Sequence, residues 1–335
     1  MTDQADNIPQ YARTSVNLAS PRMGSEAVLT SDDFFAAKER LLQDSEPVFI
    51  DDKFDDNGKW MDGWESRRRR GGGNDWCLVR LGVAGMIQGV DIDTRHFTGN
   101  YPPAASLEAC LCDGQPDESM QWTTILEPVS LGPNAHHFAG VSAAGPWNWL
   151  RLNILPDGGV ARLRVYGQPH KDWSAVDANA DVELSALANG GRVVAYNNAH
   201  YGNVWAVLAE GRGKDMGDGW ETRRRREPGN DWMIIALGAP GEVGAIEIDT
   251  AHFKGNFPDR CSVQAALVGD ATDQSLITQA MFWQPLLGEE KMSADNIHRF
   301  EGDQINDLGP VSHVRLNIHP DGGVSRFRVF GKPGL

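Results

Sequence analysis

The chain has 335 residues, of which 41% are hydrophobic, and a formal net charge of −15, which together favour two ordinary globular domains of roughly 150 residues each. The acidic balance argues against a nucleic-acid partner, because such affinity comes largely from a basic surface that neutralises phosphates. No apolar run approaches the roughly 20 residues of a membrane span, no signal peptide is visible, and the four cysteines lack a C-x-x-C pair, so we expect a cytoplasmic protein with reduced thiols and no membrane partner.

The strongest helical signal of the chain comes early, at residues 31–42, SDDFFAAKERLL. Ser31 is placed to cap the first turn through its hydroxyl group. The positions that form a helical stripe are Phe34, Phe35, Lys38, Leu41 and Leu42. We therefore expect a helix over this segment and short helical stretches at most elsewhere.

The next stretch, GWESRRRRGGGNDW at residues 63–76, places four arginines in a row. If the run is extended, Arg67 and Arg69 face one way while Arg68 and Arg70 face the other, so no single surface receives all four charges. Two interpretations stay open for these pairs. One pair forms salt bridges with acidic surface, as charge runs usually do. The other suits a small carboxylate, because a guanidinium is a planar, permanently charged donor fork.

Glu65, in the same stretch, is the best single acid–base candidate. A carboxylate beside Trp64 is partly desolvated, which raises its pKa and suits general-acid chemistry near neutral pH. The alternative is an ion pair between Glu65 and the adjacent arginines.

The block VDIDTRHFTGNYP at residues 90–102 follows the apolar run DWCLVRLG, which reads as a short strand ended by glycine. We expect ligand contacts in this block, because loops at strand ends present them in sandwich folds. An Asp-Thr pair also satisfies backbone donors in a turn, so Asp93 has an architectural interpretation beside the functional one. His96 lies among turn residues and is a candidate for proton transfer.

A further histidine, His136 in the sequence HHF, pairs with His298 in HRF, 162 residues later. No histidines have the spacing of a local metal motif such as H-x-x-x-H or H-E-x-x-H. The sequence therefore requires no cofactor, and a divalent metal stays possible only through ligands that converge in space.

The last block of the first half, RLNILPDGGVARLRVYG at residues 151–167, predicts a strand, a turn and a strand. In PDGG, proline sets the first corner of a turn and glycine adopts positive φ freely. The segment ARLRVYG alternates large apolar and polar residues, as a half-buried strand does.

The same blocks return in the same order in the second half of the chain. Trp64 and His96 recur 156 residues later, whereas RLNIHPDGGVSRFRVFG follows its first copy by 164, which implies an eight-residue insertion. A weaker echo relates residues 27–35 to residues 193–201. The repeats delimit two copies of one unit, joined by the polar segment QPHKDWSAVDANAD.

Each copy reads as strands with closely spaced turn signals. We therefore expect an all-β fold of two tandem jelly-roll β-sandwich modules, residues 11–169 and 180–335, related by internal duplication.

The repeated blocks GWESRRRR…NDW, DIDTRHFTGNYPP and RLNILPDGGVARLRVYG resemble the allantoicase family over essentially the whole chain. The layout of each module is also similar to galactose-binding-like jelly rolls. The resemblance implies a hydrolase of purine-ureide catabolism that acts on a C–N bond other than a peptide bond and converts allantoate and water into ureidoglycolate and urea. It also favours a homo-oligomer.

Allantoate carries one carboxylate and two ureido groups on a central carbon, so its recognition requires a carboxylate fork and several amide partners. The residues expected to act in catalysis are Glu65, His96 and His136 in the first copy and Glu221, His252 and His298 in the second. The residues expected to bind substrate are Arg67, Arg68, Arg69, Asn74, Asp75, Asp93, Asn100 and Arg151, with Arg223, Arg224, Arg225, Asn230, Asp231, Asp249, Asn256 and Arg315.

In the resulting hypothesis a general acid, His96 or Glu65, protonates the departing urea nitrogen, the remaining ureido group helps to expel it, and a base delivers water to the carbon. Which module carries the site stays open, because Arg95 and Tyr101 become Ala251 and Phe257 in the second copy. The alternative function is a non-catalytic carbohydrate-binding β-sandwich protein, favoured by 11 tryptophans that can stack on sugar rings.

Overall fold

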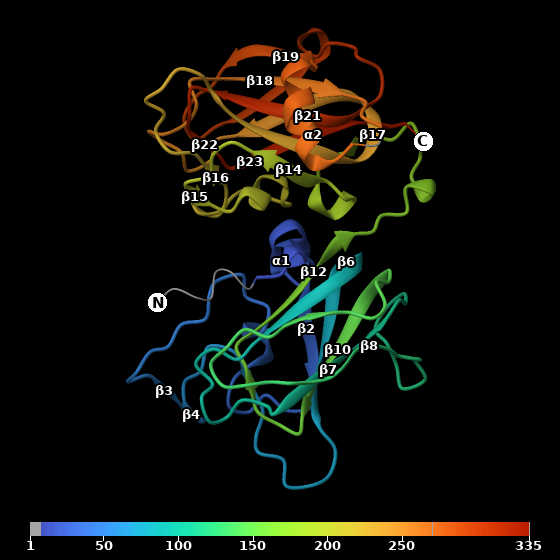
Figure 1. Ribbon diagram of the computed structural model, residues 1–335, viewed down its shortest axis with the longest axis vertical. Helices are drawn as coiled ribbons and strands as arrows, with labels where there is room; N and C mark the ends of the chain where they lie inside the picture. Colours follow the sequence, from blue (N-terminus) through green and yellow to red (C-terminus); the bar gives the residue numbers. More distant parts are fainter. Residues whose placement is uncertain (1–7, 270, 335) are drawn as a thin grey trace. The chain divides into compact units, whose positions relative to one another are not determined.

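The computed structural model describes residues 8–269 and 271–334, and the chain divides into two compact units, Met1–His170 and Lys171–Leu335 (Figure 1). Both units are built mainly of antiparallel strands. In the described ranges no helix combines the length and apolarity that a membrane crossing requires. The expected all-β fold of two duplicated sandwich modules is confirmed.

Unit 1 is organised around one long strand, β6 (Asp75–Asp93), which takes part in both layers of the sandwich (Figure 1). Its first half pairs with β2 and β10, and its second half pairs with β9 and β12. The other strands of this sheet are β1 (Val16–Asn17), β2 (Glu26–Thr30), β7 (Ala104–Cys110), β8 (Thr123–Ser130), β9 (Phe138–Gly140), β10 (Trp147–Leu155) and β12 (Arg162–Pro169).

Unit 2 repeats this arrangement around β17 (Asp231–Asp249). The other strands of its sheet are β13 (Val182–Glu183), β14 (Arg192–Tyr196), β18 (Arg260–Ala266), β19 (Gln284–Lys291), β20 (Ile297–Glu301), β21 (Val311–His319) and β23 (Arg326–Pro333). Five of the eight extra residues predicted from the repeat offsets lie between β18 and β19, the connection that contains the helix α2 (Asp273–Gln279), and the other three lie between β19 and β21.

Short elements outside the main sheets complete the units. They are α1 (Gln10–Thr14), the hairpin β3 (Phe54–Asp55) and β4 (Gly58–Lys59), the pair β5 (Trp64–Glu65) and β11 (Gly159–Val160), and in unit 2 the strands β15 (Tyr201–Gly202), β16 (Trp220–Glu221) and β22 (Gly323–Val324). The pair β5 and β11 carries residues of the repeated motifs GWE and PDGG in the first copy, and β16 with β22 carries those of the second.

The alternation of apolar and polar residues produces the core of each module. In β10 the side chains of Leu150, Leu152 and Ile154 are fully buried, while Arg151 and Asn153 between them are half-buried on the opposite face. Alternate side chains point to opposite faces of a strand, so one face fills the interior of the sandwich and the other remains available for polar contacts.

The prediction of a short strand for DWCLVRLG is wrong in length, because the strand continues past Gly82 as β6. At Gly82 a Cβ would overlap the backbone of Met23 and Gly24, and Gly238 of the second copy approaches Asn189 in the same way. Glycine stands here because two backbones come close together, not because the strand turns.

The helix expected over residues 31–42 is also wrong, since only the single 3-10 turn Lys38–Arg40 forms there. The Ser31 hydroxyl accepts the backbone N–H of Trp76, and the N–H groups of Phe35 and Ala36 both donate to the carbonyl of Glu65. The backbone N–H groups that would form bonds inside a helix thus bond to strand β5 instead. Tertiary contacts therefore outweigh the local helix propensity of this segment.

Candidate active site

A small cavity of about 360 Å³ in unit 1 contains three of the residues expected from the sequence. We call it the Glu65 pocket, and its lining residues are Phe35, Phe49, Lys59, Met61, Glu65, His96, Thr98 and Asn100. An acid, an amide and a histidine thus meet with apolar side chains in one concavity, the usual composition of a small-molecule site.

The pocket floor is set by the pairing of β5 with β11, in which Glu65 lies opposite Gly159. The N–H of Gly159 donates to the carbonyl of Asn100 at 2.7 Å, which joins the PDGG turn to the block that carries His96 and Asn100. A Cβ at Gly159 would overlap the ring of Phe97, which is fully buried. The three repeated sequence blocks therefore converge because glycine allows this close packing.

Glu65 is only 8% exposed, and burial raises the pKa of its carboxyl group. Its Oε1 accepts a hydrogen bond from Nδ2 of Asn100 at 2.6 Å, which acts in the opposite direction on the pKa and is outweighed. The expected raised pKa is confirmed, whereas the alternative of an ion pair with the adjacent arginines is replaced by this amide contact. Such a carboxyl group retains a proton to a higher pH than an exposed one.

His96 has an unusual backbone and a fixed ring. Its φ of 70° lies in the left-handed region, and its N–H donates to Oδ1 of Asn134 at 2.9 Å. The ring stacks on Phe49, with centroids 5.9 Å apart, and Nε2 lies 3.0 Å from the carbonyl oxygen of Pro47. Because a carbonyl can only accept, Nε2 carries the hydrogen, which leaves Nδ1 of a neutral ring as an acceptor.

Unit 2 repeats this constellation. Nδ2 of Asn256 donates to Oε1 of Glu221 at 2.6 Å. His252 also has a φ of 70°, its backbone N–H donates to Oδ1 of Asp295 at 2.8 Å, and its Nε2 lies 2.7 Å from the carbonyl oxygen of Gly213. Two copies of the acid, amide and histidine arrangement therefore exist in the chain.

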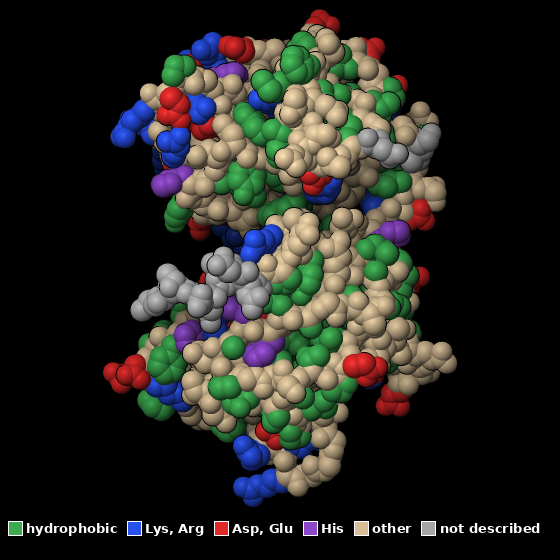
Figure 2. Space-filling model, viewed as in Figure 1, with side chains coloured by type: hydrophobic (Ala, Val, Ile, Leu, Met, Phe, Trp, Pro, Cys, Tyr) green, Lys and Arg blue, Asp and Glu red, His purple; other side chains and the backbone are tan. Residues whose placement is uncertain are grey.

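The arginine run leaves β5 as an exposed loop rather than a strand, at an end of unit 1 where basic side chains gather in Figure 2. Arg67 forms an ion pair with Asp32 at 2.6 Å, and Arg69 forms one with Asp75 at 2.9 Å. Arg68 and Arg70 are exposed and have no ion pair within the described residues. The alternation expected for the run thus separates one structural pair from one pair that is available to a ligand.

In unit 2 the corresponding loop is held by similar contacts. Arg223 pairs with Glu227 at 2.5 Å, and Arg225 pairs with Asp231 at 3.3 Å. Arg224 is exposed, as Arg68 is in unit 1.

The aspartates expected to bind substrate are buried and engaged inside the fold. Asp75 and Asp231 are almost fully buried beneath the arginine loops. Asp93 receives the backbone N–H of Arg95 and its guanidinium, and Asp249 receives the N–H of Ala251 and the side chain of Arg212. Asp93 and Asp249 therefore have the architectural position that the Asp-Thr motif allows.

A second cavity, of about 450 Å³, lies on the outer face of the sheet and contains Asn74 and Arg151. Nε of Arg151 donates to Oε2 of Glu108 at 2.8 Å, and Nδ2 of Asn74 donates to Asn153 at 3.2 Å. These two expected substrate ligands thus do not line the Glu65 pocket. The counterparts Asn230 and Arg315 lie on the matching face of unit 2.

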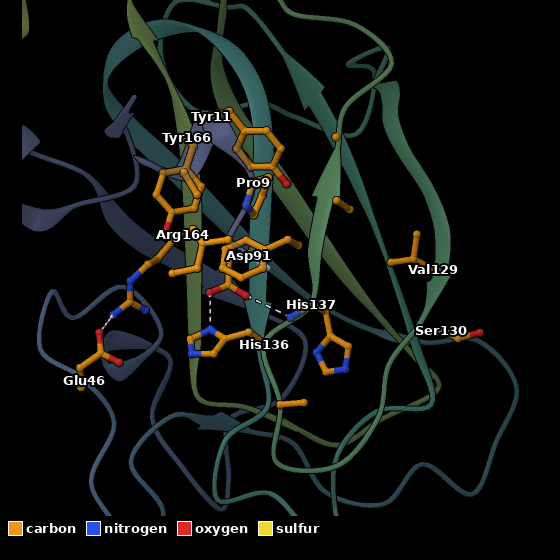
Figure 3. A pocket seen from close by; sticks show the side chains of 16 residues that line it. Pro9, Tyr11, Glu46, Asp91, Val129, Ser130, His136, His137, Arg164 and Tyr166 are labelled. Atoms are coloured by element: carbon orange, nitrogen blue, oxygen red, sulfur yellow. Dashed lines mark hydrogen bonds and ion pairs between the residues drawn. The ribbon is translucent and has the colours of Figure 1, made fainter. Parts of the chain in front are cut away.

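His136 lies in a third and larger cavity of about 1120 Å³, shown in Figure 3. Its Nδ1 contacts Oδ2 of the buried Asp91 at 2.7 Å, which raises the pKa of the imidazole. Arg164, Tyr11 and Tyr166 surround this pair in the view. The cavity belongs to unit 1 and is separate in its lining from the Glu65 pocket.

The pairing of His136 with His298 is wrong, because His298 takes the place of His137. In both His137 and His298, Nδ1 contacts the carbonyl of the equivalent isoleucine, Ile92 or Ile248, and Nε2 accepts a backbone N–H. The position of His136 is taken in unit 2 by Ile297, one residue earlier. The sequence HHF offers two histidines that could correspond to His298. The hydrogen bonds in the structure, which the sequence does not show, identify His137 as the equivalent residue.

Three possible metal ligands, Glu46, Asp93 and His136, have donor atoms within 4.8 Å of one another. Arg95 forms ion pairs with both carboxylates, and Arg164 forms a further one with Glu46 at 2.8 Å. A divalent cation would have to displace the guanidinium of Arg95, so these donors are already compensated by charges of the chain.

Several pocket residues were not expected from the sequence. Phe49, Lys59 and Met61 come from an irregular segment without periodicity or repeat, so no signal marked them. Arg162 had a signal, since the segments ARLRV and SRFRV repeat it as Arg326. Fully buried, it binds Asp62 at 2.9 Å and holds the segment that carries Lys59 and Met61.

Fold and site together define a two-module β-sandwich protein with a carboxyl group, an amide and a histidine assembled in each half, the carboxyl group being buried in the first half and half-buried in the second. Its sequence matches the model of the allantoicase repeat twice, over residues 16–170 and 182–334. The chain belongs to the allantoicase family.

The chain can be aligned with similar proteins over nearly their whole length. The chain is 59% identical to probable allantoicase 1 of Burkholderia mallei, covering 97% of this chain and 96% of that protein. It is 54% identical to the probable allantoicase of Photobacterium profundum, with 98% of each covered. A solved structure of allantoicase matches with a TM-score of 0.81 at 34% identity, covering 98% of both chains. The crystal structure of Saccharomyces cerevisiae allantoicase matches with a TM-score of 0.79, also at 34% identity, covering 95% of this chain and 93% of that chain.

Proposed function

We propose that the Glu65 pocket is the place where this chain hydrolyses allantoate to ureidoglycolate and urea. The observation that carries the assignment is the contact between Asn100 and the buried carboxyl group of Glu65, in a cavity shared with His96 and repeated as Glu221, Asn256 and His252. A volume of about 360 Å³ suits a small polar substrate.

Glu65 is the proposed general acid, because burial favours its protonated form. It gives its proton to the urea nitrogen as the bond between that nitrogen and the central carbon breaks. The lone pair of the remaining ureido nitrogen assists the departure, since the carbon behaves like an aminal. Such proton transfer typically contributes about 10²–10⁴ in rate.

His96 is the proposed base. With Nε2 donating to Pro47, its Nδ1 accepts a proton from the water whose oxygen bonds to the carbon. Water thus supplies the hydroxyl group of ureidoglycolate, Glu65 supplies the proton of urea, and solvent exchange returns both residues to their initial states. The amide of Asn100 orients the acid. Arg68 is exposed and does not line the pocket, so its role as the partner of the substrate carboxylate stays a prediction.

The test is release of urea from allantoate by the purified protein at neutral pH, with and without a chelator, beside a control without enzyme. Release that withstands chelation supports acid–base chemistry by Glu65 and His96. Release lost on chelation directs attention to Glu46, Asp93 and His136 as ligands. No release in either condition contradicts the proposal and favours the carbohydrate-binding alternative.

We further propose that the protein works as a homo-oligomer in the cytoplasm. All four cysteines are free thiols, which suits a reducing compartment. Unit 2 exposes Met281 and Phe282 side by side, at 62% and 78%, an arrangement that suits burial against another copy. Light scattering of the purified protein would contradict this if it gave the mass of one chain, 36.7 kDa, at all concentrations.

A further inference from the structure

Arg315, on β21, is a buried cation without a counter-ion. Its side chain lies opposite Gln264 of β18 in the sheet, and its guanidinium carbon is 4.9 Å from the centre of the Trp232 ring. The residue is only 9% exposed, and its Nε is buried without a hydrogen-bond partner. Within the described ranges no carboxylate forms an ion pair with it.

This arrangement is costly for a charged side chain. A charge removed from water is normally paired, because the desolvation of an isolated ion is strongly unfavourable. Burial alone lowers the pKa of Arg315, with no neighbouring carboxylate to offset it. The cation–π contact with the ring of Trp232 compensates only part of the hydration that the guanidinium loses.

Unit 1 shows what completes the same position. There Arg151 lies opposite Glu108, and Oε2 of Glu108 accepts from Nε of Arg151 and from Nδ2 of Asn153, each at 2.8 Å. An arginine and an asparagine two residues apart on one strand thus hold a carboxylate of the chain itself. The cavity of about 450 Å³ over these residues shows that the face is concave there.

In unit 2 the equivalent of Glu108 is neutral. Oε1 of Gln264 accepts from Nδ2 of Asn317 at 3.1 Å, and its Nε2 donates to the carbonyl of Trp283 at 2.9 Å. Asn230 donates in turn to Asn317 at 3.3 Å. The amides therefore satisfy one another, and among these residues Nε of Arg315 is left buried without a partner.

We propose that this face of unit 2 is a binding site for a small free carboxylate, which Arg315 holds as Arg151 holds Glu108 in unit 1. The ligand carboxylate takes the place that Glu108 has in unit 1, where unit 2 has the neutral Gln264. Its planar oxygens match the donor fork of a guanidinium, and the amide of Asn317 and the ring of Trp232 form the walls. This site uses none of the residues of the Glu221, Asn256 and His252 constellation.

The test uses the full chain and titration calorimetry with N-carbamoylglycine, a carboxylate with one ureido group and no second nitrogen on its central carbon. Gln264→Glu supplies the internal carboxylate that unit 1 has. We expect it to remove one binding event, weakening that event at least about tenfold, while binding elsewhere persists. The control ligand is the neutral amide of the same compound, which should not bind at this site in the wild type or in Gln264→Glu.

The reciprocal variant protects the test from a folding failure of Gln264→Glu. Glu108→Gln converts unit 1 to the arrangement of unit 2 and should add a binding event of similar affinity at Arg151. Identical isotherms for the wild type, Gln264→Glu and Glu108→Gln would overturn the proposal. So would a counter-ion supplied by another copy, seen as self-association of the wild type that Gln264→Glu abolishes without any change in binding of the compound.

Allantoate turnover, measured on the same three proteins, separates this site from the Glu65 pocket. A protein that releases urea normally but loses the binding event supports the second site independently of the active-site assignment.

Discussion

The proton on Glu65 is the central quantity at the scale of single residues. Because its carboxyl group is 8% exposed and touches Asn100 rather than an arginine, nothing nearby strongly favours ionisation. A protonated carboxyl group near neutral pH is what the departure of urea requires.

Glu65→Gln should lower kcat for allantoate by about 10²–10⁴ and leave KM little changed, because the amide cannot give up a proton in the transition state. Steady-state urea release measures this effect. Gln retains an oxygen that accepts from Asn100, so the fold should persist. The exposed Glu118→Gln is the matched control, and a Glu65→Gln enzyme with normal kcat would refute the acid role.

Glu221→Gln tests the second copy in the same assay. If only the first module is active, Glu221→Gln is silent. If both modules turn over, each single variant retains part of the activity and only the double variant reaches the full loss.

Glu65 should also leave a signature in the pH dependence of stability. Its folded pKa is raised from the ordinary value near 4.5, so its contribution to stability is complete below the unfolded pKa and is lost as pH rises through the folded pKa. Glu65→Gln removes this penalty. Its melting temperature relative to the wild type should therefore be higher at pH 7 than at pH 4, and an equal difference at both pH values would contradict the raised pKa.

The residues of the site were predictable only in part. Trp64 beside Glu65 correctly indicated a desolvated carboxyl group, and the repeats marked His96 and Asn100. The partner of Glu65 was not predictable, because the direction of Arg67, two residues further on, depends on its ion pair with Asp32, which is distant in the sequence. A doublet of histidines likewise has no unique match without hydrogen bonds.

At the scale of elements, the turn PDGG is what brings the repeated blocks together. Gly159 packs against Phe97, and Gly158 has a φ of 138°, a conformation that L side chains rarely adopt. The turn is therefore a close approach between strand β11 and the loop after β6, as well as a change of direction.

Gly159→Ala should destabilise the protein by about 1–3 kcal/mol, because the added methyl group overlaps the Phe97 ring in a filled core. Denaturant unfolding measures this loss. Gly99→Ala, in the loop after β6, is the control, because a Cβ there meets nothing within 4 Å. Equal stability of the two variants would show that the contact with Phe97 is not tight.

The secondary structure predicted from the sequence was correct where a strand buries one face. It was wrong where hydrogen bonds to residues distant in the sequence determine the backbone conformation. The alternation in ARLRVYG correctly gave β12, whose Leu163 and Val165 are buried. The segment 31–42 has helical spacing, yet its backbone donors bind Glu65 and its capping Ser31 binds Trp76. Propensity is local, and those partners lie more than 25 residues away.

At the scale of the whole molecule, duplication gives each unit the same interior ion pair. Arg162 and Asp62 form it in unit 1, and Arg326 and Asp218 form it in unit 2 at 3.1 Å. Each arginine also donates to several backbone carbonyls, so the pair fastens irregular loops to the last strand of its own module.

Arg162→Met should lower the free energy of unfolding by about 3–5 kcal/mol, because Asp62 is left buried without its counter-charge. Scanning calorimetry should show a lower transition temperature for the variant. The exposed pair of Arg80 and Glu26 provides the control, since Arg80→Met should cost at most about 1 kcal/mol. Similar losses for both variants would contradict the structural role of Arg162.

The two layers of each sandwich share one long strand, β6 in unit 1 and β17 in unit 2, and this determines how a module unfolds. Since the backbone of β6 is bonded to β10 at one end and to β12 at the other, neither layer separates while its partner persists. Amide protons along β6 and β17 should accordingly exchange with deuterium only when an entire module opens, and all at one common rate in the slowest class. When a force is applied to the ends of the chain, the long strand keeps the two layers of its module connected. Each module should therefore unfold in one step.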